Sequence, residues 1–267
     1  MKGKSLFGMA TAVVLAIAMI SCGGGNQPST TETPAGGAPA SAGKPVDAST
    51  VGSVKGMIKL DGAAPKMKVI NMAAEPSCAK QHSTPAMTQD VVAGTGGALA
   101  NVIVYLKGDF SSYSFDAPSG AVTIDQKGCQ YNPHVLALRT GQSLMVTNSD
   151  PTTHNIHPVP KDNREWNESQ PPGSAPINQS FAREEIAIPV KCNVHPWMKG
   201  YIGVFGNPYF QVTGDDGSFE LKNVPPGTYM LTAWHETYGA TDMMVTVGPK
   251  EDKTVNLTFK ATAAGAD

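Results

Sequence analysis

Cys192, His195 and Met198 place a thiol, an imidazole and a thioether three residues apart in the stretch CNVHPWM. Such a stretch can hold a metal ion, supply a catalytic thiol, or form only a tight turn between two strands. Upstream, isoleucine and valine occupy alternate positions in IAIPV, residues 186–190, and Cys192 continues this parity. Its sulfur is therefore expected to point into the core, whereas a reactive thiol needs an exposed, electropositive setting. The parity argues against a catalytic thiol.

A further histidine lies upstream, after a turn marked by NSDP at residues 148–151. His154 follows this turn, and with Cys192 and His195 it makes a set of two imidazoles and one thiolate. Met198 adds a weak axial thioether. This set selects copper, because zinc rarely takes a thioether whereas Cu(I) favours soft sulfur. The sequence thus predicts a copper ion held by these four residues.

Two stretches resemble the type 1 blue copper proteins, the cupredoxins, and most of all amicyanin and plastocyanin: AVTIDQKGCQYNPHVLALRTGQSLMVTNSDPTTHNIH and CNVHPWMKGYIGVF. The resemblance runs from about Gly120 to Gly206, a full cupredoxin length. It implies a Greek-key β-sandwich, one type 1 copper bound by the four residues above, and a role in electron transfer.

In that family an asparagine commonly follows the first histidine ligand, as Asn155 follows His154. The resemblance implies that its backbone N–H points at the thiolate and that its side chain ties the two ligand loops together. His157 is the competitor for His154. Residues three apart on an extended segment point to different sides, so both are not expected to bind one ion, and the His-Asn pair favours His154.

The resemblance also implies where electrons leave the protein. In the family this is the solvent-exposed edge of the C-terminal histidine, here His195. Pro196 and Trp197 would form part of an apolar docking patch for a redox protein partner. The alternative role of Trp197 is packing between the loop and the sandwich.

The chain departs from the family pattern ahead of the cysteine, where it has EEIAIPVKC. Pro189 cannot donate a hydrogen bond to a neighbouring strand, so this strand must be bulged or must leave that position facing away from a neighbour. The segment 161–180 is also longer than the sandwich needs. Neither departure involves a ligand.

The elements that carry these residues are expected to be short strands. Apolar residues alternate in VKGMIKL, TYMLTA and TVNLTF, and turn signals such as DDG at 215 and PPG at 225 separate the runs. The sequence predicts an all-β protein of two small sandwiches.

The second sandwich resembles another group of modules. YFQVTGDDGSFELKNVPPGTYMLTAWHETYG is similar to the carboxypeptidase regulatory-like sandwich and to the fibronectin-III-like module of rhamnogalacturonan lyases. VGSVKGMIKLDGAAP and LANVIVYLKGD look like its opening strands. We expect residues 51–118 and 207–262 to form one sandwich, with the cupredoxin at 119–206 inserted and a tail at 263–267. The alternative is an N-terminal extension followed by a separate module.

The N-terminus predicts export. Two lysines precede an apolar run that ends at Ser21, a pattern typical of a signal peptide at residues 1–21. The stretch MISC resembles the lipobox of bacterial lipoproteins, which implies that Cys22 is lipidated; the alternative is an ordinary cleaved signal with a spare cysteine. Residues 22–50, rich in Gly, Ser, Thr, Pro and Ala, read as a flexible tether. We expect a lipid-anchored protein at the periplasmic or cell-surface face of a bacterial membrane.

Two further cysteines, Cys78 and Cys129, most simply form a disulfide in an exported protein. A zinc-like site that adds His82 and His134 is the sharper alternative. Two free thiols are the third possibility.

The function expected from these residues is a membrane-tethered electron carrier and not an enzyme. Copper storage or delivery is the alternative, with the second sandwich binding a partner or carbohydrate. Trp166, Trp234 and His235 could line a cleft, but no paired carboxylates or activated nucleophile accompany them. The net charge of −2 and the lack of a basic patch make nucleic acid an unexpected partner.

Overall fold

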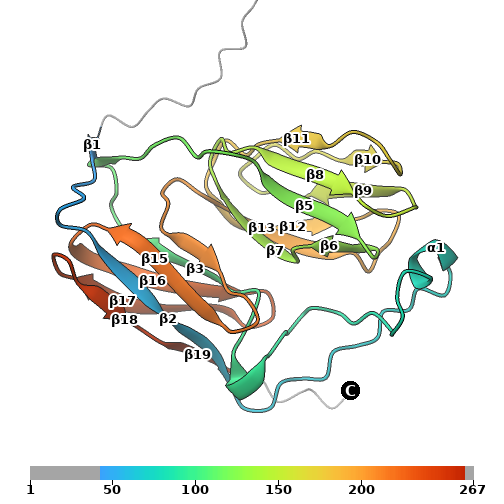
Figure 1. Ribbon diagram of the computed structural model, residues 1–267, viewed down its shortest axis with the longest axis horizontal. Helices are drawn as coiled ribbons and strands as arrows, with labels where there is room; N and C mark the ends of the chain where they lie inside the picture. Colours follow the sequence, from blue (N-terminus) through green and yellow to red (C-terminus); the bar gives the residue numbers. More distant parts are fainter. Residues whose placement is uncertain (1–42, 262–267) are drawn as a thin grey trace, which may run out of the picture. The chain divides into compact units, whose positions relative to one another are not determined.

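The structure, a computed structural model, describes residues 43–261, which form almost only β-strands (Figure 1). This confirms the predicted all-β fold class. The predicted signal peptide, the predicted lipidation site Cys22, most of the predicted tether and the tail at 263–267 lie outside the described residues. In the part of the chain that is described, no helix is long and apolar enough to cross a membrane.

The described chain begins with a strand inside the predicted tether. β1 (Lys44–Pro45) pairs in parallel with β4 (Tyr113–Ser114), and the Lys44 N–H donates to the Ser112 carbonyl at 3.1 Å. The folded part therefore starts before Val51, where we expected it to begin. That boundary came from the composition of residues 22–50, and backbone pairing of this kind is possible for residues of any type other than proline at a donor position.

One sandwich is built from strands near both ends of the described chain. Its first sheet has the order β14 (Phe210–Val212), β3 (Ile103–Lys107), β16 (Gly227–His235) and β17 (Gly239–Val247). In its second sheet β2 (Gly52–Asp61) pairs with β15 (Ser218–Val224), β18 (Asp252–Thr254) and β19 (Leu257–Lys260). Alternate residues of these strands are buried in one core, among them Val54, Ile58, Leu231 and Phe259.

The other sandwich lies between these strands in the sequence. Its five-stranded sheet has the order β10 (Glu168–Gln170), β9 (His154–Pro158), β12 (Glu185–Lys191), β13 (Lys199–Phe205) and β7 (Val135–Arg139). Its four-stranded sheet has the order β11 (Ile177–Gln179), β8 (Leu144–Asn148), β5 (Val122–Lys127) and β6 (Gln130–Asn132). The core between the sheets includes Ile124, Val146, Ile156, Ile188 and Ile202.

The strand pairing bears on the two domain arrangements. β2 and β3 precede the strands of this other sandwich, yet their partners, β14, β15, β16, β18 and β19, all follow it. An N-terminal extension would not pair in this way with C-terminal strands. The pairing favours an inserted sandwich, and we refer to β2, β3 and β14–β19 as the host sandwich.

The two sandwiches share a small apolar cluster. Ile103 and Tyr105 of the host sandwich pack with Val135 and Phe205 of the inserted one. The rings of Tyr105 and Phe205 are 5.1 Å apart.

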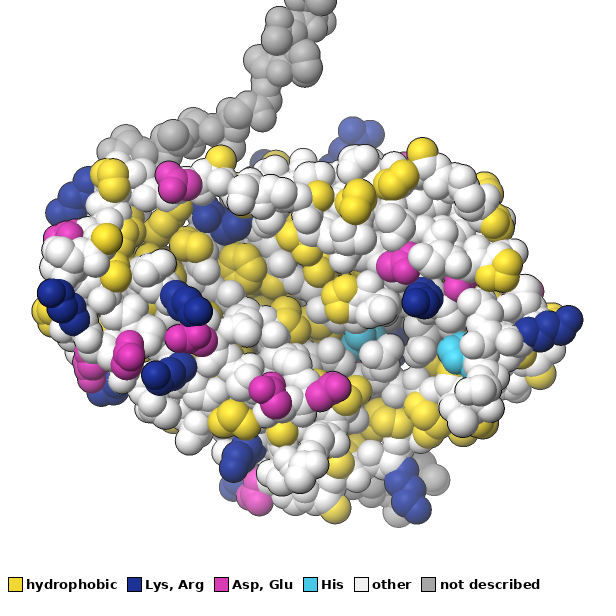
Figure 2. Space-filling model, in the orientation of Figure 1, with side chains coloured by type: hydrophobic (Ala, Val, Ile, Leu, Met, Phe, Trp, Pro, Cys, Tyr) yellow, Lys and Arg dark blue, Asp and Glu magenta, His cyan; other side chains and the backbone are white. Residues whose placement is uncertain are grey.

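Acidic and basic side chains are interspersed over the face of the molecule that Figure 2 shows.

A long connection, residues 62–102, joins β2 to β3 and contains α1 (Pro76–Ala79) and η1 (Thr95–Gly97). The connection extends from the host sandwich to the inserted one, where Ile70, Met72 and Cys78 are buried in the core. The connection therefore brings residues that are distant in sequence to the inserted sandwich.

β12 is bulged, which is one of the two alternatives expected from Pro189, although the bulge precedes the proline. Its register with β13 shifts between Glu185 and Ile188, where Ala187 adopts φ 62°. Pro189 is exposed, and its carbonyl accepts a hydrogen bond from the Val159 N–H at 2.8 Å. The apolar parity that leads to Cys192 thus begins at Ile188 and not at residue 186, because the bulge turns the preceding residues.

Candidate metal centre

Three strand ends bring the predicted ligands together. His154 is the first residue of β9, and Cys192 directly follows β12, which pairs with β9. His195 and Met198 lie in the loop before β13. Two backbone hydrogen bonds close this loop, from the Cys192 N–H to the Met198 carbonyl at 3.2 Å and from the Met198 N–H to the His195 carbonyl at 2.9 Å. All four side chains are buried, with exposed fractions of 0–2%.

The donor atoms of the two histidines and the cysteine converge. The Nδ1 atoms of His154 and His195 are 2.9 Å apart, and Cys192 Sγ is 3.8 Å from His195 Nδ1. The three ligand atoms all lie within 4.8 Å of one another. Metal–ligand bonds of about 2.0 Å to nitrogen and 2.3 Å to sulfur fit a set of this size. This donor set, with a buried methionine in the same loop, suits copper.

The thiol is prepared for the thiolate form. Burial alone would raise the pKa of Cys192, but hydrogen bonds from His154 and from the backbone N–H groups of Asn155, His195 and Val194 lower it below its ordinary value. Burial alone would lower the pKa of His154, but the hydrogen bonds and negative charges of Asp150 and Cys192 together outweigh it and raise the pKa above its ordinary value. The thiolate is the form of cysteine that binds metal.

Asn155 joins the two ligand loops. Its Oδ1 accepts hydrogen bonds from the Asn193 N–H at 2.7 Å and the Val194 N–H at 3.3 Å, and it lies 3.3 Å from Cys192 Sγ. Its Nδ2 donates to Asn167 Oδ1 at 2.6 Å. The asparagine therefore fixes the loop that follows the cysteine relative to β9.

Asp150, which the sequence places in the turn before His154, lies directly behind this candidate ligand. Its Oδ2 lies 2.8 Å from His154 Nε2, and both side chains are fully buried. The carboxylate also accepts the N–H groups of Gly128 and Cys129, each at 2.7 Å. With its Nε2 proton held by Asp150, His154 presents Nδ1 to a metal. An aspartate four residues before a ligand histidine was the available signal.

His157, the competing histidine, takes no part in this centre. Its Nε2 contacts Glu165 Oε1 at 2.6 Å and its Nδ1 contacts Asn193 Oδ1 at 3.2 Å. It points away from the buried ligand atoms, as expected for residues three apart on a strand.

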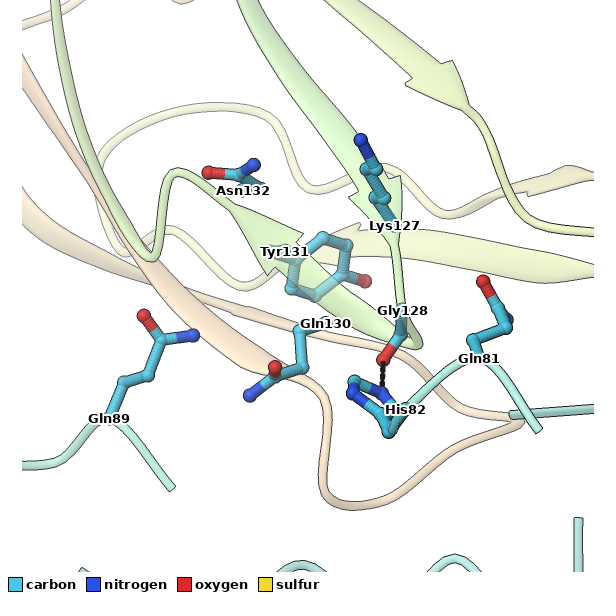
Figure 3. Close-up of a pocket in the computed structure, with 8 residues that line it drawn as sticks. All are labelled: Gln81, His82, Gln89, Lys127, Gly128, Gln130, Tyr131 and Asn132. Carbon is cyan, nitrogen blue, oxygen red and sulfur yellow. Dashed lines mark hydrogen bonds between the residues drawn. The ribbon is translucent and has the colours of Figure 1, made fainter. Parts of the chain in front are cut away.

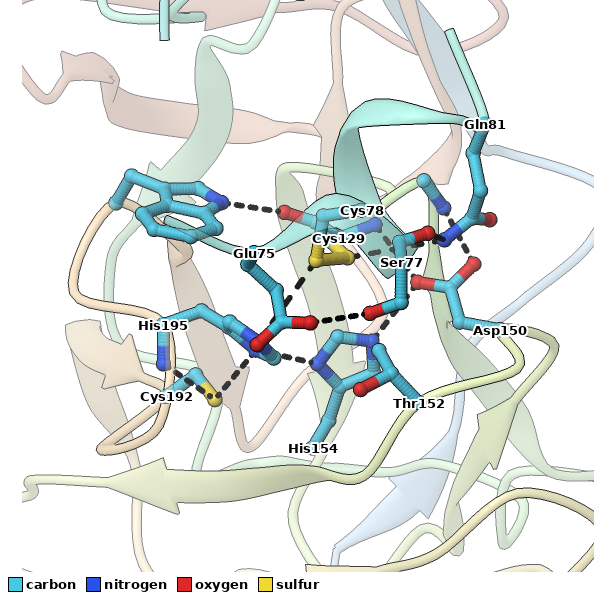
Figure 4. The surroundings of a disulfide bond; sticks show 12 residues. Glu75, Ser77, Cys78, Gln81, Cys129, Asp150, Thr152, His154, Cys192 and His195 are labelled. Carbon is cyan, nitrogen blue, oxygen red and sulfur yellow. Dashed lines mark hydrogen bonds and ion pairs between the residues drawn. A yellow bond between two sulfur atoms is a disulfide. The ribbon is translucent and has the colours of Figure 1, made fainter. Parts of the chain in front are cut away.

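Cys78 and Cys129 form a disulfide, which joins the β2–β3 connection to the turn between β5 and β6 (Figure 4). The alternative zinc-like site is not formed. His82 Nε2 instead lies 2.8 Å from the Gly128 carbonyl, and His134 pairs with Glu236. Cys129 also lies near Asp150 and His154, but its disulfide leaves no thiolate for a metal.

The prediction that one edge of His195 is exposed to solvent is wrong. The residue is 1% exposed, and its Nε2 lies 3.7 Å from Cys78 Sγ and 3.9 Å from Glu75 Oε2. Pro196 is exposed, but Trp197 is half-buried and its Nε1 donates to the Cys129 carbonyl at 3.1 Å. Trp197 thus packs between the loop and the body of the protein. The cover comes from the β2–β3 connection, which a cupredoxin pattern does not contain.

A polar pocket of about 340 Å³ adjoins the disulfide (Figure 3). Gln81, His82 and Gln89 of the connection line one part of it. The rest is lined by Lys127, Gly128, Gln130, Tyr131 and Asn132. By contrast, the residues considered for an enzymatic cleft do not meet. Trp166 packs against Phe181 within the inserted sandwich, whereas Trp234 packs edge to face with Tyr201 and His235 faces the host core.

No protein-family model and no curated protein matches the sequence. Among solved structures, part of the chain is similar to the Cu-containing nitrite reductase (NirK) from Thermus scotoductus SA-01, with 18% identity over 35% of this chain and a TM-score of 0.30. The match spans about a quarter of that enzyme, 24% of its chain. A mutant of amicyanin in its Cu(I) form is 21% identical, with 33% of this chain and 84% of that chain covered and a TM-score of 0.28. The purple cupredoxin from Nitrosopumilus maritimus is 22% identical, with 31% of this chain and 97% of that chain covered and a TM-score of 0.27.

Proposed function

We propose that this protein is an electron carrier with one type 1 copper held by His154, Cys192, His195 and Met198. The convergence of two imidazole Nδ1 atoms on one buried cysteine sulfur carries the proposal. Two nitrogens, a thiolate and a buried thioether form a set that suits copper in both of its common oxidation states. When bound, copper supplies reversible one-electron oxidation and reduction.

The surroundings of the ligands support a carrier, because hydrogen bonds from other residues hold the ligands and their loops in position. Asp150 orients His154, Asn155 fixes the loop after Cys192, and backbone hydrogen bonds close the loop around Met198. A site prepared in this way needs little rearrangement when the charge of the ion changes. The same enclosure makes copper storage or delivery less suitable, since a delivered ion must be reachable.

We also propose that the protein is exported and tethered to a bacterial membrane through lipidated Cys22, with the metal centre at the periplasmic or cell-surface side. The signal-like N-terminus and the lipobox-like MISC support this. The Cys78–Cys129 disulfide fits an oxidising compartment. In this proposal a redox protein is the partner, and the host sandwich is a regulatory-like module that binds a partner or carbohydrate.

The test is a titration of the full-length chain, in detergent, with Cu(II). We expect an intense visible absorption band from thiolate-to-copper charge transfer at one equivalent of copper, followed by its reversible loss on one-electron reduction. Cys192→Ser is the matched control and should show no band. A wild-type protein that binds copper without the band would refute the type 1 centre, and a band that does not return on reoxidation would refute the carrier role.

A further inference from the structure

Residues 72–82 of the β2–β3 connection, which we call the cap, cover the imidazole of His195. Met72 and Cys78 are buried in the core of the inserted sandwich. The Cys78–Cys129 disulfide fastens the cap covalently, and His82 Nε2 lies 2.8 Å from the Gly128 carbonyl. The cap is therefore attached to the β5–β6 turn at more than one point.

The cap presents a carboxylate to the side of His195 that faces away from the ligand cluster. Nδ1 of His195 faces His154, so Nε2 is the nitrogen that carries the proton when Nδ1 binds a metal. Two acceptors lie near Nε2, the weakly accepting Cys78 Sγ at 3.7 Å and Glu75 Oε2 at 3.9 Å. Only the carboxylate carries a charge.

Glu75 is held in this position by its neighbours. The Ser77 hydroxyl donates to Glu75 Oε1 at 2.5 Å, which leaves Oε2 directed at His195 (Figure 4). The side chain is 35% exposed, and it is not part of the apolar core.

Each of the two ligand histidines thus has its own carboxylate at Nε2. Asp150 stands behind His154 at 2.8 Å, and Glu75 stands behind His195 at 3.9 Å. The Asp150 carboxylate lies within hydrogen-bond distance and makes His154 a stronger donor. Glu75 lies beyond hydrogen-bond distance of His195, so it acts through its negative charge, which favours the more highly charged state of the metal. The first carboxylate comes from the inserted sandwich itself, whereas the second is supplied by the host's connection.

We propose that Glu75 is the electrostatic partner of His195 and that it lowers the reduction potential of the bound copper by stabilising Cu(II) relative to Cu(I). The inference rests on the proposed copper centre. The negative charge acts across a short distance beside a buried imidazole, where screening by water is weaker than at the open surface. Glu75 acts through His195 and is a positioning residue.

The experiment compares the reduction potentials of copper-loaded, full-length wild-type protein, Glu75→Gln and Glu75→Asp, followed by the visible band. Glutamine keeps the shape and removes the charge, so we expect the preference for Cu(I) over Cu(II) to rise several-fold; a tenfold rise corresponds to 59 mV. Aspartate keeps the charge on a shorter side chain, so the reduction potential of Glu75→Asp should lie between those of wild type and Glu75→Gln. Glu220→Gln, on β15 of the host sandwich, is the matched control and should leave the potential unchanged.

The outcomes separate this inference from the proposed function. A normal band together with an unchanged potential in Glu75→Gln would overturn the role of Glu75 and leave the copper centre standing. A wild-type protein without the band would overturn both. In the metal-free protein, the ¹⁵N resonance of His195 Nε2 should shift in Glu75→Gln and not in Glu220→Gln, and the absence of any shift would argue that the carboxylate does not act on this imidazole.

Discussion

His154 Nε2 lies 2.8 Å from Asp150 Oδ2, and neither side chain is exposed to solvent. The same carboxylate accepts the N–H groups of Gly128 and Cys129, and Cys129 adopts φ 52°, which is uncommon for a residue other than glycine. Asp150 therefore connects His154, a proposed metal ligand, to the turn that carries the disulfide. One buried group orients the histidine and stabilises the turn.

Replacing this carboxylate is expected to weaken metal binding. Asp150→Asn keeps the size of the side chain but loses the charge that orients and polarises His154, so copper affinity should fall about 10–100-fold. Competition with a chelator of known affinity measures the change. Asp125→Asn is the control, because Asp125 accepts hydrogen bonds from Thr147 and Ser149 and touches no ligand. Equal affinities for Asp150→Asn and wild type would contradict the assigned role.

Single replacements of two histidines distinguish the ligand from its neighbour. His154→Ala should abolish the thiolate-to-copper band, because it removes one of three converging donor atoms. His157→Ala should retain the band, since His157 contacts Glu165 and Asn193 instead. Visible spectra at saturating copper provide the measurement. Retention of the band in His154→Ala together with its loss in His157→Ala would show that His157, and not His154, is the ligand.

The disulfide is expected to stabilise the fold as well as hold the cap. It closes a loop with a sequence separation of 51 residues, for which chain entropy gives about 4 kcal/mol of stabilisation. The double variant Cys78→Ser, Cys129→Ser should lose a free energy of unfolding of this order in denaturant titrations. It should also release copper to a chelator faster than wild type, because the cap over His195 is no longer fastened. Unchanged copper release would show that the other contacts of the cap suffice.

Acid should destabilise the protein through His235. Burial lowers the pKa of this histidine to about 4, and its Nε2 has no hydrogen-bond partner among the described residues. Between pH 6.5 and 4 the unfolded state binds a proton that the folded state does not, so stability is greatest above pH 6.5 and falls by up to about 3 kcal/mol toward pH 4. Glu236 opposes the effect, and His134 adds to it.

Chemical denaturation of the metal-free protein at a series of pH values measures this loss. His235→Asn supplies a neutral acceptor in place of Nδ1, which accepts the Thr237 N–H. The variant should be less stable at neutral pH but should show a smaller decrease between pH 6.5 and 4. The same decrease in both proteins would assign the acid sensitivity to another group.

Local sequence patterns were sufficient for much of the fold and of the metal centre. Period-two alternation predicted the strands, and Pro189 indicated a bulge as one of two alternatives for β12. The ligands Cys192, His195 and Met198 lie in one short loop, so their spacing already restricts their geometry. The residue types themselves limit the metal, because the softness of the donor atoms is a property of each side chain and does not depend on the fold.

The sequence by itself therefore determined the ligand types, the strand that presents Cys192 and the cysteines available for a disulfide. Only the tertiary structure decided what surrounds His195, because Glu75 and Cys78 are more than a hundred positions away and reach it through a connection between strands of the other sandwich. It also decided that Asp150 faces His154. Contacts of this kind depend on how buried surfaces meet, which alternation and spacing along one chain do not encode.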